Sequence, residues 1–136
     1  MLLTRALRKI MGMGHRWGFG VQSPYAYNFV KILFQEDKAL RKLDKQTQLI
    51  TKIRKSCKEE IAIFQPSEYD KIMQYVNTHT DNTLVIVKDI YCCRENYRNW
   101  KKLLPKDSIR MTFDLYYIGV LAIRKGLYKK DFIINY

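Results

Sequence analysis

The chain has 136 residues, 47% of them hydrophobic and 28% charged, which is typical of a globular protein and excludes a disordered one. Twenty-five Lys and Arg residues against 13 Asp and Glu residues give a formal charge of +12. The length suits a single domain over residues 1–136, and we expect no second domain.

The positive charge is concentrated near the N-terminus, since 13 of the basic residues and only five of the acidic ones lie in the first 60. Such a surplus attracts nucleic acid, anionic lipid or acidic proteins, and it also keeps a protein in solution. We favour solubility, because no nucleic-acid-binding signature of mixed aromatic and basic residues accompanies the charge. The candidate basic surface is Arg5, Arg8, Lys9 and Arg16.

The cysteines Cys57, Cys92 and Cys93 form no CxxC pair and no spaced framework, which indicates reduced thiols in a cytoplasmic protein. The first residues lack the apolar core of a signal peptide, and no later stretch reaches transmembrane length. We therefore expect a cytoplasmic chain with no membrane span. His15 and His79 have no partners at metal-ligand spacing, so we expect no metal site.

The first 60 residues read as a helical N-terminal segment. A basic amphipathic helix is predicted over residues 2–11, and a glycine-rich hinge follows over residues 12–20. Ser23 as N-cap with Pro24 at the first helical position starts a second helix. A third helix is predicted from Lys38 to about Lys58, with a narrow buried stripe of Leu40, Leu43, Ile50, Ile53 and Cys57.

Residues 61–136 alternate between strand and helix patterns. The apolar run Ile61–Phe64 is a predicted strand, Ser67 caps the next helix, and Leu84–Tyr91 begins as a strand buried on both faces. Strand, helix and strand make a βαβ unit, so these two strands should be parallel. We place the strand of Leu84–Tyr91 at the centre of the sheet.

The remaining elements follow in the same half. A helix is predicted over Arg94–Leu104, with Tyr97, Trp100 and Leu104 facing inward. Alternation predicts a strand over residues 109–116 with Asp114 paired to Arg110 or Lys88, and Gly119 at the following turn or bulge. Two further strands are expected over residues 120–123 and 132–136.

Two stretches resemble one family. Gly20–Tyr27 (GVQSPYAY) resembles the N-terminal "GVHSPF" segment of class I S-adenosylmethionine-dependent methyltransferases found in Bacteroidetes. Leu84–Tyr91, Trp100 and Phe113–Gly119 resemble the C-terminal half of the same proteins. The resemblance implies an α/β fold: a partial Rossmann-like methyltransferase sheet of about four to five strands, with the first three strands missing and the N-terminal helices packed on it.

The chain also departs from this family. No glycine occurs between Gly20 and Gly119, so the family's glycine-rich cofactor loop has no counterpart. The family's carboxylate and histidine after the strand matching Ile61–Phe64 are replaced by Gln65, Pro66 and Ser67. The resemblance therefore implies a chain without catalytic residues and without a bound cofactor, unless S-adenosylmethionine is held with help from another chain.

A residual crevice is expected at the carboxyl end of the strand in Leu84–Tyr91, with Lys88, Asp89 and Tyr91 as its candidate residues. In metal-dependent relatives an aspartate at the position of Asp89 helps to hold a divalent cation. One carboxylate beside a lysine supplies too few oxygen ligands for Mg²⁺ or Ca²⁺. We favour a helix-capping or loop-closing role for Asp89.

The favoured function is an interaction or oligomerisation module that has lost cofactor binding and catalysis. Because the first three strands are missing, Ile61–Phe64 should form an open edge that the 38–58 helix covers or that pairs across a homodimer. One alternative is a methyltransferase whose S-adenosylmethionine pocket is completed by a partner or dimer mate. Another is binding of nucleic acid or anionic surfaces through the basic N-terminal helices.

Overall fold

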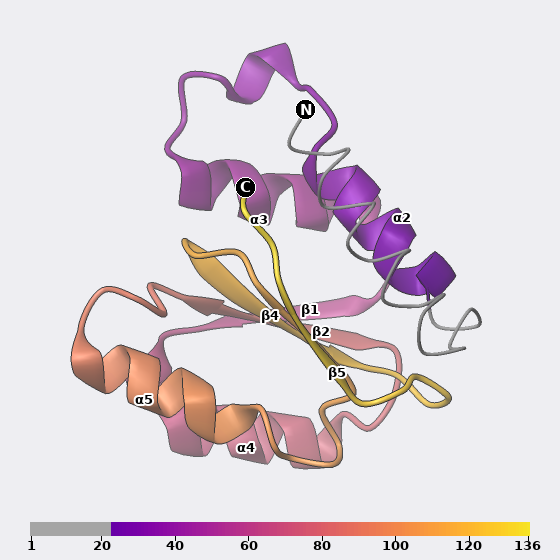
Figure 1. Ribbon diagram of the computed structural model, residues 1–136, viewed down its shortest axis with the longest axis vertical. Coiled ribbons are helices and arrows are strands. Elements are labelled where there is room, and N and C mark those ends of the chain that lie inside the picture. The colour runs from indigo at the N-terminus through magenta and orange to yellow at the C-terminus, as the bar shows by residue number, and fades with distance from the viewer. Residues whose placement is uncertain (1–22) are drawn as a thin grey trace. The chain divides into compact units, whose positions relative to one another are not determined.

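The computed structural model describes residues 23–136, which divide into two compact units (Figure 1). The first unit comprises the described residues up to Ser56 together with Asn135 and Tyr136, and the second runs from Cys57 to Ile134. The expected helix over residues 2–11, the glycine-rich hinge and the basic surface of Arg5, Arg8, Lys9 and Arg16 lie outside the described residues. No helix within residues 23–136 is both long and apolar enough to cross a bilayer.

The first unit contains α2 (Ser23–Leu33), the 3₁₀ helix η1 (Lys38–Leu40) and α3 (Lys45–Ser56). The helix predicted from the Ser-Pro pair is confirmed, because α2 begins there. Its buried face consists of Ala26, Phe29, Val30 and Leu33.

The prediction of one continuous helix from Lys38 to Lys58 is wrong, because residues 41–44 separate η1 from α3. Asp44 causes the interruption: its carboxylate accepts hydrogen bonds from the Thr47 amide at 2.8 Å and the Thr47 hydroxyl at 2.9 Å, so a new helix starts there. The buried stripe changes accordingly. Leu43 is 41% exposed, whereas Leu49 is fully buried beside Ile53.

The second unit is an α/β structure built on a five-stranded open sheet in the order β1-β2-β4-β3-β5. The strands are β1 (Glu60–Phe64), β2 (Thr83–Lys88), β3 (Met111–Asp114), β4 (Ile118–Ile123) and β5 (Lys130–Ile133). β1 and β2 are parallel, with α4 (Tyr69–Thr78) between them in sequence, so the predicted parallel βαβ unit is confirmed. β4 runs antiparallel to β2 and β3, which makes the sheet mixed.

The strand from Leu84 is buried on both faces as predicted, but it is not central. β4 occupies the centre, because the β3–β4 hairpin inserts its second strand next to β2. β3 is also shorter than predicted and buried on both faces, since Thr112 is 1% and Asp114 7% exposed. The buried Thr112 hydroxyl donates a hydrogen bond of 2.8 Å to the Asp131 carboxylate.

Gly119 lies within β4 and not at a turn, which corrects the sequence prediction. The turn is formed by Leu115–Tyr117 instead. A Cβ atom on Gly119 would lie 2.4 Å from two atoms of the Trp100 ring, far inside van der Waals contact. Glycine is therefore required here because the indole packs directly on the backbone of the central strand.

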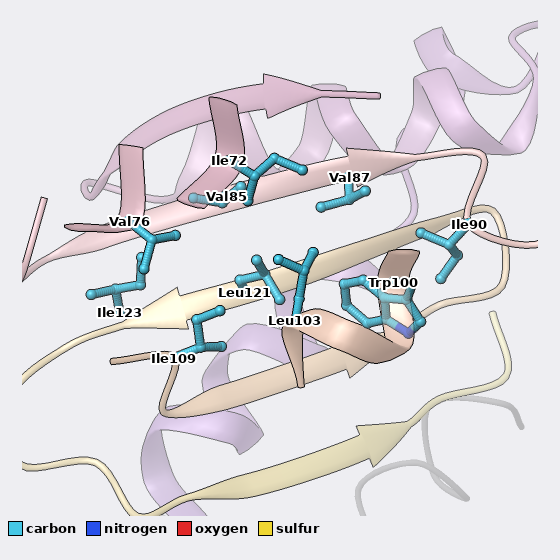
Figure 2. Packing of buried hydrophobic residues seen from close by; sticks show 10 residues of the cluster. All are labelled: Ile72, Val76, Val85, Val87, Ile90, Trp100, Leu103, Ile109, Leu121 and Ile123. Carbon is cyan, nitrogen blue, oxygen red and sulfur yellow. The ribbon is translucent and has the colours of Figure 1, made fainter. Parts of the chain in front are cut away.

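One face of the sheet is covered by α4 and by α5 (Arg94–Leu103). An apolar cluster fills the space between these two helices and the sheet (Figure 2). The helices contribute inward residues at helical spacing, and β2 and β4 contribute alternate residues. The cluster consists of Ile72, Val76, Val85, Val87, Ile90, Trp100, Leu103, Ile109, Leu121 and Ile123.

The start of α4 also differs in detail from the prediction. The short 3₁₀ helix η2 (Pro66–Glu68) precedes it, and Ser67 lies inside η2 rather than at the cap. The Glu68 carboxylate reaches back to accept the Gln65 amide at 2.9 Å, which lowers the pKa of Glu68 below its usual range. Gln65 and Glu68 thus form the N-terminal cap.

Candidate functional site

The candidate residues Lys88, Asp89 and Tyr91 lie where β2 ends and the chain turns towards α5. Lys88 is the last residue of β2, and Asp89 has a φ of +53°, in the left-handed region that few non-glycine residues adopt. The amide of Asp89 donates to the Tyr117 carbonyl at 3.3 Å, and its carbonyl accepts from the Cys92 amide at 3.1 Å. The backbone of Asp89 thereby closes this loop against the β3–β4 turn.

Tyr91 and Asp114 are brought together although 23 residues separate them in sequence. The Tyr91 hydroxyl donates to one oxygen of the Asp114 carboxylate, and the other oxygen accepts the Tyr116 amide at 3.0 Å. The expected pairing of Asp114 with Arg110 or Lys88 is therefore corrected. The Arg110 guanidinium instead donates to the Asp107 carbonyl, in the loop before β3, and to the Leu127 carbonyl, in the loop between β4 and β5.

The environment keeps the Tyr91 hydroxyl protonated. Burial and then the adjacent Asp114 carboxylate raise the pKa of Tyr91 well above its usual value near 10, because both disfavour the phenolate. A hydroxyl in this state is a hydrogen-bond donor and not a general base at physiological pH. The Tyr91–Asp114 contact is accordingly a structural tie between the β2–α5 loop and the β3–β4 turn.

Four aromatic rings gather around this tie, and we call them the tyrosine cluster: Tyr91, Tyr97, Tyr116 and Tyr117. The Tyr91 ring stacks between Tyr97, at a centroid distance of 4.9 Å, and Tyr116, at 5.2 Å. Tyr117 meets Tyr116 edge-on at 5.1 Å. Sequence reasoning missed the cluster, because the strand predicted over residues 109–116 includes Tyr116, whereas β3 ends at Asp114. The available signal was that a tyrosine follows the end of β2 and two more follow the end of β3.

The backbone at Tyr116 is held in an unusual conformation, with a φ of +69°, and the residue is 60% exposed. The buried Asp114 carboxylate fixes this turn through the Tyr116 amide. The chemistry of the arrangement is thus that of a hydrogen-bonded aromatic surface. It supplies stacking area and hydroxyl groups rather than a nucleophile next to a base.

The remaining candidates for site chemistry are metal ligands and the three cysteine thiols. Within residues 23–136 no group of three or more His, Cys, Asp or Glu side chains is arranged to hold a metal ion. Cys92 and Cys93 are exposed just before α5. Burial, with a smaller contribution from Glu59, raises the pKa of the Cys57 thiol to about 11, so this thiol is unreactive near neutral pH.

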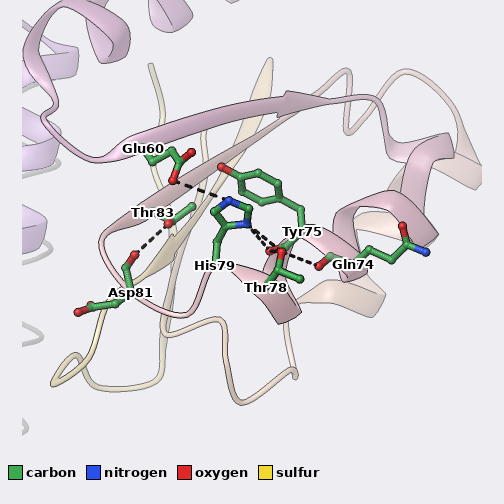
Figure 3. A network of polar contacts seen from close by, with 7 residues as sticks. All are labelled: Glu60, Gln74, Tyr75, Thr78, His79, Asp81 and Thr83. Carbon is green, nitrogen blue, oxygen red and sulfur yellow. Dashed lines mark hydrogen bonds and ion pairs between the residues drawn. The ribbon is translucent and has the colours of Figure 1, made fainter.

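His79 takes part in a polar network at the amino-terminal end of β1 (Figure 3). Its Nε2 atom lies 3.8 Å from the Glu60 carboxylate, and its Nδ1 atom lies 3.0 Å from the Tyr75 carbonyl. The imidazole also stacks on the Tyr75 ring at 3.8 Å. The network connects the start of β1 to the end of α4, which is a structural role.

Comparisons of the chain with protein-family models, with curated proteins and with solved structures give no match.

Proposed function

We propose that this chain is a protein-interaction module that pairs with a second copy of itself through the outer edge of β1, without catalytic activity of its own. The observation that carries the proposal is the contrast between the two edges of the sheet. β5 carries charged Lys130 and Asp131, which is how natural edge strands discourage pairing. β1 instead presents the uninterrupted apolar run Ile61–Phe64, with Pro66 only after its end.

The hydrogen-bonding direction of β1 supports pairing at this edge. The Glu60 amide donates to the Asn82 carbonyl at 3.1 Å, towards β2. Because successive amides of an extended strand point to opposite sides, the amides of Ile61 and Ile63 point to the outer edge. A twofold axis beside this edge would pair the two β1 strands antiparallel and join the two sheets.

The loss of catalysis is supported by the carboxyl end of β2. In an enzyme of this layout, that edge would present groups able to bind a cofactor or to transfer protons. Here Tyr91 and Asp114 bind each other, and the tyrosine cluster packs around them. The lack of any glycine between Gly20 and Gly119, where a cofactor loop would follow a strand, points in the same direction.

Light scattering across a concentration series tests the proposal on the full chain. The unmodified chain should be dimeric at high concentration, and Ile63→Pro should be monomeric with unchanged circular dichroism, because proline removes an amide that only the outer edge uses. Ile63→Val is the matched control, since it keeps that amide and should remain dimeric. A monomer at every concentration contradicts the proposal.

Calorimetric titration with S-adenosylmethionine separates this function from the enzymatic alternative. The interaction module should release no binding heat as a dimer or as the Ile63→Pro monomer. Saturable heat that disappears in the monomer would instead favour a methyltransferase whose pocket is completed by the dimer mate.

A further inference from the structure

The first unit contains a cleft of about 290 Å³ between the end of α2, the loop after it, the first turns of α3 and the Tyr136 side chain. All of its lining residues belong to this unit. Those that matter chemically are Phe34, Arg41, Lys45, Gln48, Lys52 and Tyr136. The volume is at the lower end of the range for small-molecule pockets, which suits a ligand with one ring or sugar.

One wall of the cleft is a polar face of α3. Lys45, Gln48 and Lys52 follow one another at spacings of three and four residues, so they share this face. The ring of Tyr136 lies against it, with the Lys45 ammonium 5.5 Å and the Lys52 ammonium 5.1 Å from the ring centroid. Two positive charges therefore flank a single aromatic ring, and an anion between them would relieve their mutual repulsion.

The acidic side chains that line the cleft already have other partners. The Asp37 carboxylate lies 3.3 Å from the Lys55 ammonium and also accepts the Ala39 amide at 3.0 Å. The Glu36 carboxylate lies 3.9 Å from the Arg41 guanidinium. These two carboxylates are thus matched by cations other than the two lysines beside Tyr136.

The polar partners of Lys52 are neutral, since its ammonium donates to the Leu33 carbonyl at 2.9 Å and to the Tyr136 hydroxyl at 2.7 Å. No ion pair among the described residues includes Lys45 or Lys52. Each ammonium group has three donors, so Lys52 retains one donor beyond these two contacts. Neither ammonium group therefore has a carboxylate oxygen within 4.0 Å among the described residues.

We propose that this cleft binds a small phosphomonoester. A phosphate monoester carries about −1.5 to −2 charges at neutral pH, which matches Lys45 and Lys52, and its oxygens accept several hydrogen bonds. The rings of Phe34 and Tyr136, 5.4 Å apart and tilted by 47°, provide an apolar wall for the organic part of the ligand. The site is independent of β1, so it stands or falls separately from the proposed dimer.

Calorimetric titration of the full chain with phenyl phosphate tests the proposal, with inorganic phosphate and phosphatidic-acid vesicles as separate arms. We expect one saturable site, weaker binding of inorganic phosphate, and no preference for the vesicles. Equal affinity for inorganic phosphate would overturn the role of the aromatic wall. Binding to the vesicles alone would assign the phosphate chemistry to a lipid surface and overturn the small-molecule proposal.

The matched variants are Lys45→Gln and Lys42→Gln. Both remove one positive charge from an exposed residue, and the two residues are close together in the chain. Only Lys45 lines the cleft, so Lys42→Gln is the control. Lys45→Gln should weaken phenyl phosphate binding about tenfold, the effect of losing one charged hydrogen bond, and Lys42→Gln should change it less than about twofold. Equal losses in both variants, or no saturable heat with the unmodified chain, would refute the site. Binding should also tighten between pH 5 and 7.5 as the phosphate loses its second proton near pH 6.

Discussion

Gly119→Ala is the substitution whose effect follows most directly from the packing of the second unit. The new Cβ atom would lie 2.4 Å from two atoms of the Trp100 ring and 2.8 Å from a third. The indole is 1% exposed and is packed in the core cluster, so it cannot rotate away without displacing its neighbours. Overpacking of this kind costs about 3 kcal/mol of unfolding free energy or more.

Urea denaturation followed by circular dichroism measures this loss, and Gly126→Ala provides the control. Gly126 has a φ of +89°, and a Cβ atom added there would have no other atom within 4 Å, so alanine adds backbone strain of about 1–2 kcal/mol without a clash. Gly119→Ala should therefore be the more destabilising of the two. In the Gly119→Ala background, Trp100→Leu should cost much less than it does alone, since it removes the overlapping ring. A Gly119→Ala protein within about 1 kcal/mol of the unmodified chain would refute the packing argument.

The remaining predictions concern the tyrosine tie and the thiols. Tyr91→Phe should lower the unfolding free energy by about 1–2 kcal/mol in urea denaturation, because the buried Asp114 carboxylate loses a donor, and an unchanged midpoint would contradict the tie. The pKa of Tyr91 is higher in the folded chain than in the unfolded chain. The contribution of Tyr91 to the unfolding free energy is therefore complete below the unfolded pKa near 10 and is lost as the pH rises above it. The unmodified chain should therefore lose stability above pH 10 more steeply than Tyr91→Phe, and parallel stability curves would be inconsistent with the raised pKa. At pH 8, iodoacetamide should modify Cys92 and Cys93 about tenfold faster than Cys57 or more, as mass spectrometry can follow, and equal rates would contradict the burial of Cys57.

Local patterns in the sequence predicted the elements of the second unit well. The βαβ unit of β1, α4 and β2 and the helix α5 follow from apolar periodicity and from short apolar runs, which depend on neighbouring residues alone. The Ser-Pro start of α2 is equally local. These signals also sufficed for the α/β class.

The errors lie where distant residues decide the outcome. The central position of β4 depends on strand pairing across the sheet, and the need for glycine at residue 119 depends on the Trp100 ring from α5. The Tyr91–Asp114 contact likewise joins two loops that sequence spacing does not connect. The interruption before α3 is different, because an Asp before a helical pattern is a local N-cap signal. The prediction missed Asp44 because it followed the apolar residues from Leu40 to Cys57 as one stripe.

The most direct test of the proposed interaction module is amide hydrogen exchange of β1, measured by NMR at low and at high protein concentration. If β1 pairs with a second copy, the outward amides of Ile61 and Ile63 should become more protected as the concentration rises, while the amides of the charged edge strand β5 should not change. Exchange at Ile61 and Ile63 that is the same at both concentrations would contradict the pairing of this edge between copies.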